Sequence, residues 1–346
     1  MNHIERFYRT IERKPVDRPA TWIGEPVHAA IPGLLKYFEV ESFIELKKKV
    51  DDDVYHVNIP YKSPTSNHVA AAFDFAKKKD LNHDYEERTL TAPGFFEDYE
   101  DPAGVADFDW PDPEKYIDPA KCLEAVKEVP EGAVAMVLAW SCHFQDACAA
   151  FGMETALVKM ITEPEMFSAV IDRITEFYLT ANEIFYKATK GHLHAVLIGN
   201  DFGSQQALML SPELIRTLVF PGTKKLIDQA HSYGLKVVHH SCGCIYDIIP
   251  DLIDLGADAI HPMQALAHNM DADRLSRDFG GKVSFCGGVD AQNLLVHGTP
   301  EEVAAEVKRL AGLFPTGLIV SPSHEAILTD TPPANIEAIF SAIHSL

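Results

Sequence analysis

The feature that most constrains the fold is a strand–helix alternation that runs through the second half of the sequence. Short apolar runs of strand length alternate there with longer amphipathic segments of helical periodicity. The runs expected to form strands are HAVLIGND (194–201), LKVVHHSC (235–242), ADAIHP (257–262), VSFCGG (283–288) and GLIVSPSH (317–324). Strands that alternate with helices in this way predict a parallel sheet.

The segments between and after these runs carry helix start and stop signals. Over 211–234, Ser211 is expected to be the N-cap, Pro212 to occupy the first helical position and Gly234 to end the helix. A Thr-Pro-Glu-Glu start signal opens another amphipathic segment at 299–314. The remaining expected helices are 245–256, 271–279 and 333–344.

Three further candidate strands lie upstream, at 20–24, 54–59 and 133–140. Eight strands favour a closed (β/α)8 TIM barrel in the α/β class, and a chain of 346 residues suits a single elaborated barrel domain. An open, doubly wound sheet is the alternative architecture. No Gly-x-Gly-x-x-Gly follows a strand, so the sequence has no dinucleotide-binding fingerprint.

Residues 62–120 do not fit the alternation. This stretch is rich in Lys, Asp, Pro and aromatic residues. Long loops in compact domains are usually functional or disordered, so we interpret it as an insertion or lid after the second strand, covering or bordering the active site.

The charge balance narrows the choice of partners. There are 51 Asp and Glu residues against 30 Lys and Arg, a formal net charge of −21. Such a surface repels nucleic acid and anionic lipid, so neither is expected as a partner, whereas a basic protein could dock. There is no secretion signal and no apolar run near the ~18 residues that span a bilayer, so we predict a cytoplasmic protein.

The candidate chemistry lies where the expected strands end. In a barrel of this kind the active site is built at the carboxyl ends of the strands. Five consecutive strands deliver mostly His, Cys and Asp to that rim, which core packing alone does not require. These residues are Asn200, Asp201, His239, His240, Cys242, His261, Gln264, Cys286, Asp290, His324 and Glu325.

The sharpest pattern is His240-x-Cys242. Residues i and i+2 of a strand face the same side, so an imidazole and a thiolate could bind one ion, and these ligand types suit zinc. A buried cysteine beside a helix-capping histidine is the alternative explanation. His324 is the first choice for a third ligand, and Cys286 is the second.

The other polar residues carry less specific signals. Asp201 is a candidate acid–base residue together with His324, or else an N-cap for the loop that follows it. His239 should point opposite to His240, into helix packing. Side chains from several strand ends could bind a substrate, although a solvated or supporting position would explain them as well. These candidates are Asn200, Gln205, His261, Gln264 and Asp290.

Five segments of the sequence match one known pattern. HHSCGCIYDIIPDLIDLGADAIHPMQ contains His-x-Cys-Gly followed by a helix and a strand, and FCGGVDAQNLLVHGTPEEV contains Gly-Gly-x-Asp-x-Gln and Gly-Thr-Pro-Glu-Glu-Val. NDFGSQQALMLSPELIRTLVFPGTKKLID, SPSHEAILTDTPPANIEAI and ERKPVDRPATW extend the match towards both ends of the chain. Together they resemble the uroporphyrinogen decarboxylase superfamily, most strongly from about residue 194 onward. The resemblance implies a (β/α)8 barrel.

Departures from the superfamily pattern bear on the reaction. The decarboxylases carry an arginine-rich segment near the N-terminus that grips the substrate carboxylates, and this sequence has TWIGEPVHAAIPG there instead. His261 stands where the superfamily has Asn, and Ser323 and Glu325 replace glycines of the decarboxylase pattern. The sequence is therefore poorly suited to bind a substrate with eight carboxylates, which needs a cationic pocket.

The methyltransferase branch of the superfamily fits better. Those enzymes bind zinc through His-x-Cys and a late Cys; His240 and Cys242 match, and His324 stands at the late position. The resemblance implies methyl transfer between a small substrate, either a methylated O, N or S compound or a thiol, and a corrinoid on a partner protein. Zn²⁺ and a methylcorrinoid are then the cofactors.

Two other functions are left open by the sequence. One is a metal-independent carboxy-lyase like the decarboxylase of porphyrin biosynthesis, with Asp201 and His324 in acid–base roles. The other is a non-catalytic binding barrel, which the crowded polar rim disfavours. Whether the chain forms a homodimer is also left open.

Overall fold

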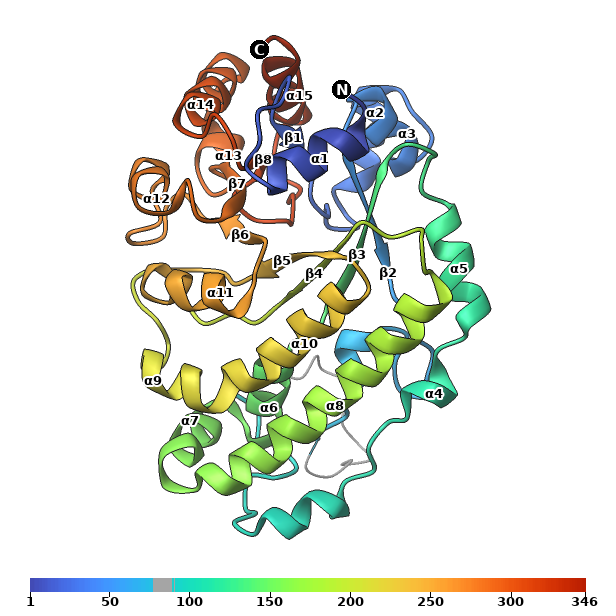
Figure 1. Cartoon of the computed structure of the whole chain (residues 1–346), viewed down its shortest axis with the longest axis vertical. Helices are drawn as coiled ribbons and strands as arrows, with labels where there is room; N and C mark the ends of the chain where they lie inside the picture. Colours follow the sequence, from blue (N-terminus) through green and yellow to red (C-terminus); the bar gives the residue numbers. More distant parts are fainter. Residues whose placement is uncertain (77–88, 90) are drawn as a thin grey trace.

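The computed structural model describes residues 1–76, 89 and 91–346, and it confirms the predicted (β/α)8 barrel (Figure 1). Eight strands pair in parallel in the order β1-β8-β7-β6-β5-β4-β3-β2. This order runs one way and places β1 beside β8, whereas a doubly wound sheet reverses its order at a switch point. The strands are β1 (Ala20–Thr21), β2 (Val54–Asn58), β3 (Val134–Trp140), β4 (Ala195–Gly199), β5 (Lys236–His240), β6 (Ala259–Met263), β7 (Ser284–Val289) and β8 (Leu318–Pro322).

Helices surround the strands (Figure 1). Before β3 lie α1 (His3–Ile11), α2 (Ile31–Phe38), α3 (Phe43–Lys49), η1 (Val69–Ala71), η2 (Pro102–Asp107), α4 (Pro113–Tyr116) and α5 (Pro119–Lys127). Between β3 and β5 lie α6 (His143–Phe151), α7 (Met153–Thr162), α8 (Pro164–Ala188), α9 (Pro212–Leu214), η3 (Ile215–Val219) and α10 (Phe220–Ser232). The rest are η4 (Tyr246–Ile248), α11 (Ile249–Leu255), α12 (Ala272–Phe279), α13 (Leu294–His297), α14 (Pro300–Leu313) and α15 (Pro333–His344).

The predicted helix signals are confirmed, with one difference. The side chain of Ser211 caps α9, and α14 begins with a reciprocal capping box between Thr299 and Glu302. The helix predicted over 211–234 is interrupted by a π-helical turn at η3. Pro221 lies two residues after this turn and has no N–H, so the regular backbone bond from that position cannot form.

The barrel closes between β1 and β2 through side chains. In the described chain these two strands form no backbone ladder. The carboxylate of Asp53 accepts the N–H of Thr21 at 2.9 Å, and that of Asp52 accepts the N–H of Ile23 at 3.1 Å. Asp53 also accepts hydrogen bonds from Arg6 and Arg18 at 2.6 and 2.7 Å. The closure thus lies at the start of β2, away from the carboxyl ends of the strands.

The insertion after β2 is confirmed, and its described part contributes to the core. Phe73 packs against Phe177 of α8 with ring centroids 4.7 Å apart, and Phe96 packs against Phe151 of α6 at 6.0 Å. Phe96 is fully buried. Whether the insertion also acts as a lid stays a prediction, because residues 77–88 and 90 lie outside the described residues.

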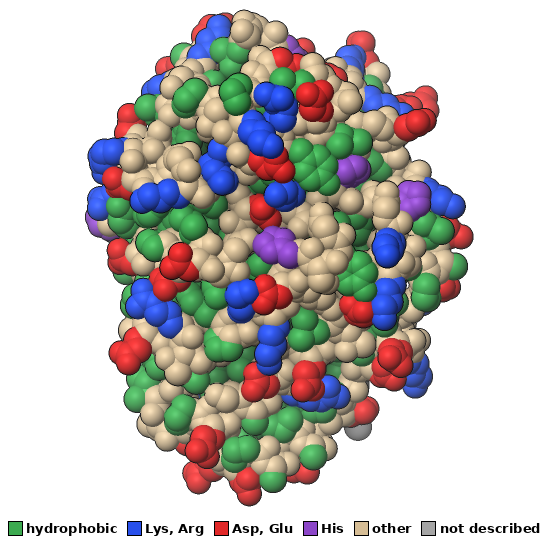
Figure 2. All heavy atoms as spheres, viewed as in Figure 1, with side chains coloured by type: hydrophobic (Ala, Val, Ile, Leu, Met, Phe, Trp, Pro, Cys, Tyr) green, Lys and Arg blue, Asp and Glu red, His purple; other side chains and the backbone are tan. Residues whose placement is uncertain are grey.

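The surface mixes charges of both signs. On the face drawn in Figure 2, acidic and basic side chains are interspersed among apolar ones. Among the helices of the described residues, none combines the length and the apolar character needed to cross a membrane.

Candidate metal centre

The chain segments after β4 and β5 bring three predicted residues together. Gly199, the last residue of β4, pairs with His240, the last residue of β5. A Cβ at Gly199 would lie 2.0 Å from the carbonyl oxygen of His240, so glycine lets the two segments run this close. Asp201 follows two residues after Gly199, and Cys242 two residues after His240, so both reach the same point of the rim.

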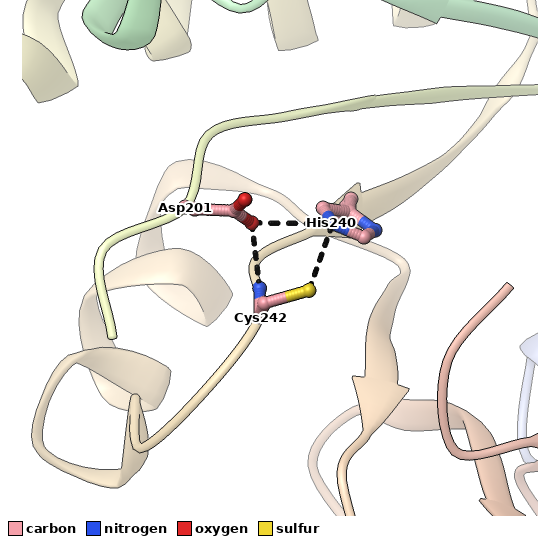
Figure 3. Close-up of side chains that lie close together, drawn as sticks. All are labelled: Asp201, His240 and Cys242. Atoms are coloured by element: carbon pink, nitrogen blue, oxygen red, sulfur yellow. Dashed lines mark hydrogen bonds and ion pairs between the residues drawn. The ribbon is translucent and has the colours of Figure 1, made fainter. Parts of the chain in front are cut away.

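Asp201, His240 and Cys242 form a compact cluster (Figure 3). The Nε2 atom of His240 lies 3.5 Å from Sγ of Cys242 and 3.2 Å from Oδ1 of Asp201. The same Oδ1 accepts the backbone N–H of Cys242 at 2.8 Å, which fixes the carboxylate over the turn. The three ligand atoms therefore face a common point.

These distances fit a zinc ion. Zn–N distances of about 2.0–2.1 Å and a Zn–S distance of about 2.3 Å put N and S about 3.5 Å apart around a tetrahedral ion. With a Zn–O distance of about 2.0–2.2 Å, N and O lie about 3.4 Å apart. The observed separations of 3.5 and 3.2 Å are close to these edges. Thiolate, imidazole and carboxylate are also the ligand types that zinc takes in proteins.

The protonation of the cluster follows from its contacts. Burial disfavours charge on His240, but its hydrogen bonds to Asp201 and Cys242 and the charge of Glu325 outweigh burial and raise its pKa well above the usual value. Burial also opposes ionisation of Asp201, yet the hydrogen bond and charge of His240 lower the pKa of Asp201 to about 2. Without an ion the two residues thus form an imidazolium–carboxylate pair, whose proton an ion on Nε2 would replace.

His324 approaches the same cluster from the end of β8. Its hydrogen bond with Cys242 is the largest influence on the ring and raises the pKa of His324. Its Nδ1 accepts the backbone N–H of Ala326 at 3.1 Å. A neutral ring whose Nδ1 is an acceptor carries its proton on Nε2. His324 thus has its Nδ1 engaged by the backbone, whereas the ligand atoms that lie close together are those of Asp201, His240 and Cys242.

A second layer lies on the barrel side of His240. Its Nδ1 is 2.9 Å from Nδ1 of His261 and 3.8 Å from Oε2 of Glu325. These three residues form a second group with ligand atoms close together. The ring of Trp140 meets that of His240 edge-on, with centroids 5.2 Å apart.

The remaining predicted residues mostly support the backbone. Gln264 accepts the N–H of Gly243 at 2.6 Å and so holds the turn after Cys242. Asn200 is buried and accepts the N–H of Phe144 at the start of α6. The carboxylate of Asp290 accepts backbone N–H groups of its own loop, including that of Leu294 at 2.9 Å.

Three other predicted positions lie apart from the cluster. Gln205 is exposed. Cys286 lies in the middle of β7, buried among the apolar side chains inside the barrel, and belongs to neither group of ligand atoms found among the described residues. His239 is fully buried and its ring stacks on Phe202, opposite to His240 as predicted.

Two contributors were not predicted from the sequence. Glu325 is predicted to lie at a strand end, but the sequence pattern assigns it no role in the site. Its position directly after His324 is the signal that could have indicated one. Trp140 and Ser141 have φ values of 55° and 54°, which are uncommon for residues other than glycine. Nothing in the sequence marks this left-handed turn, which aims Trp140 at His240.

A cavity of about 260 Å³ opens beside His324. Its walls come from the loops after β6, β7 and β8 and include Gln264, Gln292, Val296 and Leu328. Its lining combines polar side chains, such as Ser323 and His324, with apolar ones. A small molecule in this cavity would lie next to the cluster that His324 contacts.

Comparisons with known proteins agree with this architecture. The family described as "Uroporphyrinogen decarboxylase (URO-D)" matches residues 2–346. Uroporphyrinogen decarboxylases of Chlamydia trachomatis serovars L2 and D are each 24% identical to the chain over 349 residues, covering 98% of both sequences. A methyltransferase from Methanosarcina mazei superposes with a TM-score of 0.68 at 17% identity, covering 100% of this chain and 99% of its own.

The chain belongs to the uroporphyrinogen decarboxylase family. It is an enzyme of that superfamily. The relatives found by sequence are decarboxylases, and a methyltransferase shares the fold. The reaction must therefore be argued from the site itself.

Proposed function

We propose that the protein is a zinc-dependent methyltransferase that moves a methyl group between a small substrate and a corrinoid carried by a partner protein. The observation that carries the proposal is the cluster of Asp201, His240 and Cys242, whose ligand atoms have the spacing of a tetrahedral zinc site. When bound, zinc would polarise a heteroatom of the methylated substrate or keep a thiol substrate deprotonated.

The residues around the cluster would prepare it for this role. Asp201 and Cys242 together supply two negative charges, which balance a divalent cation. A hydrogen bond from His324 to the sulfur of Cys242 would withdraw electron density from the thiolate. The cavity beside His324 would hold the substrate, with Gln264 at its wall able to orient a polar group.

The charges at the rim argue against a polycarboxylate substrate. In the described part of the chain, the ion pairs of Asp201 and Glu325 are with histidines rather than with lysine or arginine. Two carboxylates facing the site would repel the acetate and propionate groups of a uroporphyrinogen. This supports methyl transfer over porphyrin decarboxylation.

A metal-free lyase is the second candidate. The separation of 3.2 Å between Asp201 and His240 is also that of a charged hydrogen bond, so the pair could move a proton without an ion. In that case His324 would act with Asp201 in acid–base chemistry.

Metal analysis of the purified protein separates the two. We expect one zinc per chain, lost in Cys242→Ser together with methylation of cob(I)alamin by a panel of methylated O, N and S compounds. The control Cys286→Ser should keep both, because that thiol lies inside the barrel. Full activity of the metal-free protein, or of Cys242→Ser, would refute zinc catalysis.

The same assay identifies the third ligand. Asp201→Asn should weaken zinc binding by more than ~100-fold, beyond the ~10–100-fold typical of residues that only support a ligand. His324→Gln, which keeps an N–H donor, should stay within that smaller range. The reverse order would make His324 the ligand, as the sequence suggested.

A further inference from the structure

His240 uses both of its ring nitrogens in the folded protein. Nε2 faces Asp201 and Cys242, whereas Nδ1 faces the interior of the barrel. Two groups compete there for the Nδ1 proton: Nδ1 of His261 at 2.9 Å and Oε2 of Glu325 at 3.8 Å. Only the shorter distance is within hydrogen-bonding range, so His261 is the partner.

The contact between the two rings is built into the sheet. His240 and His261 are register partners on the adjacent strands β5 and β6, so both side chains enter the barrel at the same level. Both are buried, and the ring of His261 rests against that of Trp22 with centroids 5.2 Å apart. Moving the ring of His261 away from His240 would disturb its contact with Trp22.

An ion on Nε2 would settle the direction of the hydrogen bond. A histidine that binds a metal through Nε2 keeps its only proton on Nδ1. That proton must go to His261 Nδ1, so His261 acts as the acceptor and carries its own proton on Nε2. The latter atom is buried and has no hydrogen-bond partner among the described residues.

We propose that His261 is a positioning residue for the metal centre: it accepts the Nδ1–H of His240 and thereby holds Nε2 on the point shared with Asp201 and Cys242. This inference rests on the proposed zinc site, and it goes beyond it by giving a role to a histidine that stands where the superfamily pattern has Asn. Metal-binding histidines commonly donate their second N–H in this way, usually to a carboxylate, a backbone carbonyl or a water.

Two variants test the acceptor rather than the packing. His261→Leu fills similar space but offers no acceptor, whereas the Oδ1 atom of His261→Asn can take the place of Nδ1. We expect His261→Leu to weaken zinc binding by ~10–100-fold in a chelator competition. His261→Asn should stay within about threefold of the wild type on the same reasoning. Thermal unfolding of the metal-free variants would confirm that both fold.

A second readout follows the proton itself. In zinc-loaded protein labelled with ¹⁵N-histidine, His240 should carry its proton on Nδ1 and His261 on Nε2. Wild-type affinity of His261→Leu, or an equal loss in His261→Asn, would overturn the positioning role while leaving the zinc site intact. Two zinc ions per chain, one lost in His261→Leu, would overturn it in favour of an ion between the two rings. Absence of zinc from the wild type would instead defeat the proposed function.

Discussion

Asp146 allows a quantitative test of how strongly burial shifts the pKa of a carboxyl group in this protein. Its carboxyl group lies on α6, where it accepts a hydrogen bond from Tyr178 at 2.5 Å. Burial raises the pKa of Asp146 to about 7, against about 3.9 in an unfolded chain. In the folded protein the group therefore stays protonated at pH values where the unfolded chain has already released the proton.

The sign of the effect follows from this difference. Below about pH 3.9 both states are protonated and Asp146 does not alter the free energy of unfolding. As the pH rises to about 7, ionisation of Asp146 favours the unfolded state increasingly. Above about pH 7 the resulting loss in the free energy of unfolding is constant. About three pKa units at 1.36 kcal/mol each give an upper value of about 4 kcal/mol.

The perturbation is Asp146→Asn, which keeps an acceptor for Tyr178 and cannot ionise. We expect the variant to be more stable than the wild type by up to about 4 kcal/mol at pH 8 and by only about 1 kcal/mol at pH 4.5. Urea unfolding at the two pH values measures this. Asp172→Asn on the exposed face of α8 is the matched control. A difference that does not grow with pH would refute the reasoning.

Two further predictions concern the framework. Asp53→Ala should lower the free energy of unfolding by about 3–5 kcal/mol in urea titration, because it leaves Arg6 and Arg18 without their buried partner. The control is Asp51→Ala, which should lower it by less than about 1 kcal/mol because the Asp51 carboxylate is 55% exposed. Phe96→Ala in the insertion should cost about 3–5 kcal/mol, so a small loss would show that the insertion is a dispensable cover.

The sequence predicted the fold because its local signals agree with its long-range pairing. Ser211, Gly234 and the Thr299 start signal each lie at a helix boundary in the structure. The closure between β1 and β2 could not be predicted in this way. β1 is only two residues long, and its missing partner is replaced by carboxylates whose positions depend on the tertiary fold.

The site residues that could be predicted together are those that lie close together in the sequence. His240 and Cys242 share one strand end, so their spacing alone placed them together. The depth of Cys286 could not be predicted, because β7 continues to Val289 and so leaves the thiol inside the barrel. The acceptor role of His324 Nδ1 depends on the backbone of Ala326, a contact that residue identity does not reveal.

The choice of third ligand decides the chemistry that the proposed centre can support. With His324 as the ligand, one thiolate would face a divalent cation and the centre would keep a positive charge. With Asp201, a carboxylate replaces the late thiolate of the methyltransferase branch and the centre is neutral.

Oxygen donates less electron density to zinc than sulfur does, so the ion stays a stronger Lewis acid than it would with a second thiolate. A neutral, acidic centre suits activation of an oxygen- or nitrogen-bound methyl group better than generation of an electron-rich thiolate. The preference for methylated O and N compounds over methylated S compounds as methyl donors to cob(I)alamin should therefore follow Asp201, and it should weaken in Asp201→Cys.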